Sequence, residues 1–141
     1  MIRQEFVIDT KPWKVYVYYD FVLDDINEVI STLEDINFPE HYITSAYTIL
    51  KQTTTNCGFT YTHLENKTTL IVITKTTSPG QFINSLVHEI FHLVNHISKV
   101  YNIDNDSEEP CYLAGDIAQQ ALSVCHKLLC KHCRNTKHHR N

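Results

Sequence analysis

The sequence predicts an α+β fold, and three observations lead to that prediction. Short runs rich in β-branched and aromatic residues, which favour strands, lie in the first part of the chain. Longer stretches repeat apolar residues at the spacing of a helix, and two of them fill the second half. The order of strands, helix, hairpin, helix and helix is typical of an α+β layout. At 141 residues the chain fits a single domain.

The first half of the chain begins with two strands. Residues 5–8 and 15–19 are β-branched and aromatic runs separated by Thr-Lys-Pro, which predicts two short strands joined by a turn. Apolar residues then recur at helical spacing over residues 22–36 until a proline follows, so we expect a helix there. Residues 43–50 repeat this spacing and predict a second, shorter helix.

A hairpin and two long helices follow. Residues 58–64 and 69–74 are rich in Thr, Tyr, Ile and Val and flank the polar sequence ENKT, which predicts a β-hairpin. Ser78, with proline next and glutamine three residues on, has the capping-box pattern and starts a helix predicted over residues 79–101. After a polar connector, apolar spacing predicts a last helix over residues 108–131.

The charge of the chain is unevenly distributed. Five of the 12 basic residues follow position 125, so residues 1–125 carry seven basic and 16 acidic residues and a net charge of −9. Such an acidic body argues against a general nucleic-acid-binding protein. We therefore expect residues 1–125 to form one domain and residues 126–141 to form a basic tail that contains cysteine and histidine.

The composition also bears on the compartment. The N-terminal residues lack the apolar core of a signal peptide, and no apolar run approaches the roughly 20 residues that cross a bilayer. The five cysteines are odd in number and leave the first half of the chain with few thiols, unlike a secreted disulfide framework. We expect a cytoplasmic protein without a membrane partner.

The segment SLVHEIFHLV, in the middle of the long helix, carries the strongest chemical signal. Four residues of α-helix turn through about 400° and rise about 6 Å, so His88 and His92 project from one side and can bind one ion. Imidazole nitrogens suit Zn²⁺, and Glu89 can reach a zinc-bound water without binding the metal itself. The pattern predicts zinc-dependent peptide hydrolysis with Glu89 as general base. The alternative is a histidine pair that is merely solvated or satisfied in the core.

A catalytic zinc site normally has three protein ligands, so a third one is required. His96 lies about 12 Å along the helix axis from His88, too far to share one ion, and we assign it to the surface or behind the ligands. Glu108 and Glu109, which open the last helix, are suitably placed if that helix folds back. Acidic residues are also common in the first turn of any helix, because they complement its dipole. Asp116 could accept a hydrogen bond from a ligand histidine.

The sequence VHEIFHL, the preceding hairpin GFTYTHLENKTTLIVITKTTSP and the following SEEPCYLAGDIA together resemble the minimal gluzincin-type zincin metallopeptidases. The resemblance is greatest to small uncharacterised members from gut bacteria and their phages, and it covers roughly residues 56–122. It implies that His88 and His92 bind zinc, that Glu89 is the general base, and that the substrate is a peptide or protein.

In that family the acidic zinc ligand stands four residues before the tyrosine of a Y-L-x-G segment. This tyrosine is Tyr112 here, so the resemblance selects Glu108 as the third ligand, with Glu109 as the fallback. Cys111 stands where the pattern usually has alanine, and a thiol so close is a competing soft ligand. The resemblance also implies that the edge strand of a small sheet receives an extended substrate, and we expect residues 70–74 to form that strand.

Three other hypotheses follow from the sequence. A zincin-like module that keeps the zinc, or only the scaffold, would act as a regulatory or interaction protein, for example one encoded by a phage. The tail sequence Cys130-Lys131-His132-Cys133, together with His138 and His139, could form a structural zinc knuckle, although the full pattern of two C-x-x-C motifs is absent. The basic tail could also contact nucleic acid.

Overall fold

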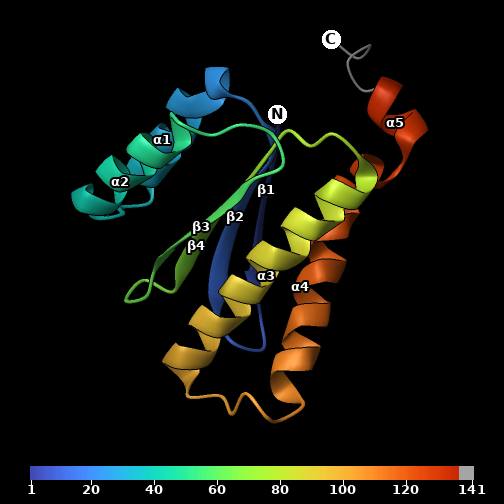
Figure 1. Ribbon diagram of the computed structural model, residues 1–141. Helices are drawn as coiled ribbons and strands as arrows, with labels where there is room; N and C mark the ends of the chain where they lie inside the picture. The colour runs from blue at the N-terminus through green and yellow to red at the C-terminus, as the bar shows by residue number, and fades with distance from the viewer. Residues whose placement is uncertain (137–141) are drawn as a thin grey trace.

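The structure is a computed structural model that describes residues 1–136, and its fold is α+β, as the sequence predicts (Figure 1). Helices α1 and α2 cover one face of a four-stranded sheet, and α3 and α4 cover the other. The elements are β1 (Ile2–Ile8), β2 (Trp13–Phe21), η1 (Leu23–Asp25), α1 (Ile26–Asp35), α2 (Glu40–Leu50), β3 (Gly58–His63), β4 (Thr68–Thr74), α3 (Pro79–Tyr101), α4 (Glu109–Cys125), η2 (His126–Leu129) and α5 (Lys131–Thr136).

The sheet has the strand order β1-β2-β4-β3. The pairs β1–β2 and β3–β4 are antiparallel, whereas β2 and β4 run parallel. All seven residues of β4 are buried, because this strand lies inside the sheet and helices cover both of its faces. The expectation that residues 70–74 form an edge strand is therefore wrong. Their continuous apolar run is the pattern of a strand buried on both faces, and β3 is the edge next to α3.

The core between the sheet and α3 determines which face of this helix is exposed. Its α3 members are the buried residues Phe82, Leu86, Ile90, Leu93, Val94 and Ile97. Trp13 of β2 packs in the same core, and its Nε1 donates a hydrogen bond of 2.9 Å to Thr69 Oγ1 of β4. This apolar stripe leaves His88 and His92 exposed beside it, as the helical spacing predicts.

Helix α3 begins and ends where the sequence predicts. The Oγ of Ser78 accepts a hydrogen bond of 3.1 Å from the backbone N–H of Gln81, and Pro79 occupies the first helical position. At the other end Asn102 adopts a left-handed conformation with φ 53°, and its N–H donates to the carbonyl oxygen of Ser98. The result is a helix of 23 residues, capped at both ends, with the histidine pair near its middle.

Replacing Ser78 by alanine should lower the free energy of unfolding by about 1 kcal/mol, because the N–H of Gln81 loses its partner at the helix start. Urea unfolding of the two proteins measures the difference. A Ser78→Thr variant keeps the hydroxyl and should retain most of the stability. Equal unfolding midpoints for the alanine and threonine variants would contradict a capping role for this residue.

The segment after α4 differs from the predicted continuation of the helix. The predicted last helix ends at Cys125 rather than at residue 131, and a 3-10 turn follows. Leu128 in that turn is only 1% exposed and belongs to the core under α3. The guanidinium of Arg134 donates to the carbonyl oxygens of Leu128 and Thr76 and to the Oγ1 of Thr76. The residues that we expected to form a tail therefore begin with a segment that packs on the domain.

Among residues 1–136, no helix is both long enough and apolar enough to cross a membrane.

Candidate metal centre

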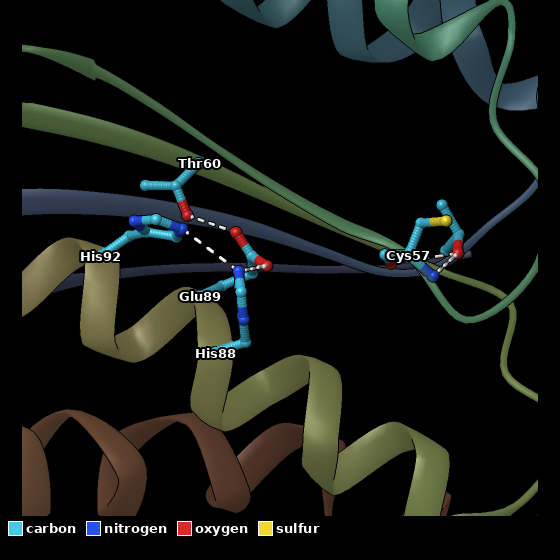
Figure 2. A network of polar contacts seen from close by, with 6 residues as sticks. Cys57, Thr60, His88, Glu89 and His92 are labelled. Atoms are coloured by element: carbon cyan, nitrogen blue, oxygen red, sulfur yellow. Dashed lines mark hydrogen bonds and ion pairs between the residues drawn. The ribbon is translucent and has the colours of Figure 1, made fainter.

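The two histidines of the HExxH segment lie side by side on the exposed side of α3. Their Nε2 atoms are 3.2 Å apart, and the ring centroids are separated by 4.9 Å (Figure 2). Two nitrogens bound to one tetrahedral Zn²⁺ at about 2.05 Å are about 3.3 Å apart, so His88 and His92 fit a shared ion. The same separation also allows one neutral imidazole to donate a hydrogen bond to the other.

Glu89 is buried between α3 and the edge strand β3, with only 3% of its surface exposed. Its Oε1 accepts a hydrogen bond of 2.8 Å from the Oγ1 of Thr60, and its Oε2 lies 3.9 Å from the Nε2 of His88 (Figure 2). The hydroxyl of Thr60 therefore occupies one carboxylate oxygen and leaves the other directed toward the histidine pair.

Gly58 allows the strand to approach this carboxylate closely. A Cβ atom at Gly58 would lie 2.7 Å from Oε2, 2.8 Å from Cγ and 2.9 Å from Cδ of Glu89, which is closer than real Cβ contacts. The absence of a side chain at this position is therefore required for the observed packing of β3 on Glu89.

Two depressions open beside the histidine pair, one toward each end of α3. The first has a volume of about 290 Å³ and is lined by Asn56, Cys57, Gly58, Phe59, Asn84, Ser85, His88 and Glu89. The second has a volume of about 590 Å³ and is lined by His92, Asn95, His96, Ser98, Lys99, Asn102, Ile103 and Asn105. The site is therefore an open region along α3 rather than an enclosed cavity.

His96 lies one helical turn beyond His92 and is half-buried against β3. Its Nδ1 is 2.7 Å from the Oγ1 of Thr62, which in turn is 2.8 Å from the Oγ1 of Thr69. Burial lowers the pKa of His96, and the nearby His92 and Lys99 lower it further. This contact directs His96 toward the sheet, whereas the sequence left open a place at the surface or behind the histidine pair.

The structure does not bring Glu108 to the histidine pair. Glu108 is exposed at the start of α4 and lines a depression with Tyr112 and Asp116, while the Oε2 of Glu109 forms an ion pair of 2.9 Å with Lys11. Within the part of the chain that the structure describes, no group of three or more His, Cys, Asp and Glu side chains is placed to hold one metal ion. The assignment of Glu108 or Glu109 as third ligand stays a prediction that this arrangement does not support.

The path of the chain explains this separation. Helix α3 continues for nine residues after His92, which carries the chain about 13 Å further along the helix axis before it can turn back. Helix α4 then packs against the α3 face that carries Ile90 and Val94. That face lies about 200° around the helix from His92, because two residues of α-helix turn through that angle. The last helix therefore returns on the side of α3 away from the histidines.

The other predicted metal-binding groups are also placed apart from the histidine pair. Cys111 lines a groove between α3 and α4 with Phe91 and Ala114, not the depressions beside His88 and His92. Cys130 directly precedes α5, and His132 and Cys133 lie in that helix; they do not belong to a three-ligand group among the described residues. His138 and His139, which completed the proposed zinc knuckle, lie outside the described residues.

Sequence reasoning missed the residues of β3 that contact α3. Gly58, Thr60 and Thr62 alternate along this strand, and the period of two places them on one face. The sequence alone shows that alternation. It does not show the position of the strand relative to the helix, which brings Thr60 to Glu89 and Thr62 to His96.

Comparison with known protein families, curated proteins and solved structures found no match for this chain.

Proposed function

We propose that this protein is a zinc-dependent peptidase in which His88 and His92 bind the metal and Glu89 is the general base. The observation that carries this proposal is one constellation on α3. Two imidazole nitrogens 3.2 Å apart lie next to a buried carboxylate whose free oxygen is directed toward them. Burying a carboxylate is unfavourable unless it has polar partners, and here Thr60 bonds one oxygen of Glu89 while the other faces His88.

The metal and Glu89 would have separate roles in the proposed hydrolysis. A bound zinc ion would polarise the scissile carbonyl and lower the pKa of its bound water. The Oε1 of Glu89 is held by Thr60, and Oε2, which faces His88, would accept the proton of the attacking water and pass it to the leaving amine.

The edge strand β3 supports a peptide as substrate. The strand pairs with β4 on one side only, so its other edge can pair with an extended main chain. Gly58 of this strand is in direct contact with Glu89, and Cys57 and Phe59 line the depression that contains His88. A peptide added to this edge would therefore pass beside the general base.

A second candidate function is zinc binding without catalysis, in a regulatory or interaction protein. Glu108 lies away from the histidines, so among the described residues the site has two protein ligands, one fewer than catalytic zinc sites normally have, which weakens the case for catalysis. Both candidate functions require zinc binding at His88 and His92, and only the first requires peptide hydrolysis.

Zinc titration followed by a cleavage assay tests both candidates. We expect the metal-free protein to bind one zinc ion. Loss of a residue that only orients a ligand weakens zinc affinity by up to about 100-fold, so His88→Ala and His92→Ala, which remove ligands, should each weaken it more than that. His41→Ala removes an exposed histidine of α2 and should bind zinc normally. Cleavage of a mixed peptide library, lost after chelation, would support the peptidase. Zinc binding without cleavage would support the second candidate, and no zinc binding would refute both.

A further inference from the structure

The cysteines Cys130 and Cys133 form a pair that the metal site does not use. Cys130 is exposed and directly precedes α5, and Cys133 is half-buried within that helix. The backbone N–H of Arg134 donates a hydrogen bond of 2.9 Å to the carbonyl oxygen of Cys130, which closes a helical turn over the pair. Residues three apart in such a turn have Cα atoms about 5 Å apart, within the range of about 4.4–6.8 Å found for disulfides. The two thiols can therefore be joined without moving the backbone far.

The surroundings of Cys130 differ from those of Cys125. The backbone N–H and the thiol of Cys133, together with the backbone N–H of His132, form hydrogen bonds to the sulfur of Cys130 and lower its pKa. Cys125 shows the opposite case, since burial raises the pKa of its thiol to about 11. Because the thiolate is the nucleophilic form, exposed Cys130 is the cysteine best placed to react and buried Cys125 is inert.

We propose that Cys130 and Cys133 are a reversible redox pair that exchanges with low-molecular-weight disulfides. In the first step the Cys130 thiolate attacks one sulfur of the disulfide RSSR, forms a mixed disulfide and releases RS⁻, which takes up the proton that Cys130 lost. In the second step the Cys133 thiolate attacks the Cys130 sulfur, closes the intramolecular disulfide and releases the second RS⁻, which takes up the proton from Cys133. The two protein sulfurs are oxidised by two electrons and RSSR is reduced to two RSH.

The pair lies on a segment that is attached to the start of α3. Arg134, next to Cys133, donates to Thr76, two residues before the helix cap Ser78. The redox pair is thus part of the folded protein, and it does not depend on whether the histidine pair binds zinc.

Incubation of the reduced full-length protein with glutathione disulfide, followed by mass spectrometry of tryptic peptides, tests the proposal. We expect the wild type to lose two hydrogens and to yield a disulfide between Cys130 and Cys133. Cys133→Ser should stop at one glutathionyl group on Cys130, because no thiol resolves the mixed disulfide. Cys130→Ser should show complete loss of the intramolecular disulfide and no glutathionylation at Cys133.

Cys111 provides an internal comparison, since it is an exposed thiol on α4 without a neighbouring cysteine three residues away. It should react more slowly than Cys130 in the same sample, and Cys111→Ser should leave the disulfide yield unchanged. Separate glutathionyl groups on Cys130 and Cys133, or equal rates at Cys130 and Cys111, would overturn the proposal. The proposal would also be overturned if zinc bound tightly to Cys130 and Cys133 and blocked their oxidation, since the two cysteines would then form a metal site.

Discussion

Replacing Glu89 by glutamine should lower the rate of peptide hydrolysis by roughly two to four orders of magnitude while leaving zinc affinity unchanged. Glutamine has the same shape and its Oε1 can still accept the hydrogen bond from Thr60, so the packing under β3 is conserved. It cannot accept the proton from the attacking water. The loss should therefore appear in kcat, measured with any peptide that the wild type cleaves, and not in the zinc titration.

A matched change elsewhere makes this result specific. Glu65 is exposed in the turn between β3 and β4, and Glu65→Gln removes the same charge from the molecule without touching α3. It should retain wild-type hydrolysis. Full activity of Glu89→Gln would exclude Glu89 as the base, and loss of zinc binding in that variant would mean that its carboxylate is a ligand instead.

The helices were predictable because the apolar pattern and the end signals agreed. Helix α3 has both a Ser-Pro start and a continuous apolar stripe, and its predicted range of residues 79–101 is confirmed. The last helix lacked a stop signal after Cys125, since neither glycine nor proline interrupts the apolar spacing that continues to Leu128. A 3-10 turn that serves tertiary packing cannot be distinguished from helix by that spacing alone.

The histidine pair was predictable and its third ligand was not, for a physical reason. The positions of His88 and His92 depend only on local helix geometry, which the spacing determines. The position of Glu108 depends on where α3 ends and on which face of it α4 packs. Helix α4 packs on the face of α3 that carries Ile90 and Val94, away from the histidines. Burial of apolar surface determines this packing, and the ligand requirement of the site does not.

The sheet order was likewise a question of tertiary structure. The sequence predicted the hairpin β3–β4, but its residue pattern did not indicate which of the two strands would pair with β2. The parallel pairing of β2 with β4 places β3 at the edge and brings Thr60 and Gly58 onto Glu89. The contacts that support the proposed site thus arise from a pairing between segments far apart in the sequence.

Replacing Gly58 by alanine should lower both stability and hydrolysis, because the new Cβ occupies space now filled by Glu89. Three atoms of Glu89 lie within 2.9 Å of that Cβ position. Overpacking of this kind costs about 1–3 kcal/mol in the free energy of unfolding. A general base displaced by about 1 Å can lose about 100-fold in kcat. Urea unfolding and the peptide assay measure the two effects separately, and the first needs no catalytic activity.

Two further variants distinguish this steric effect from a general intolerance of alanine. Gly80→Ala, in the first turn of α3, would place its Cβ no closer than 3.9 Å to Ser78 Oγ and should leave stability unchanged or slightly raised. Gly58 has no positive φ, so alanine suits its backbone and any loss must come from the contact with Glu89. In a Glu89→Ala background the Gly58→Ala change should then cost much less than in the wild type. Equal costs in the two backgrounds would show that the close approach of β3 to this carboxylate contributes nothing to the fold.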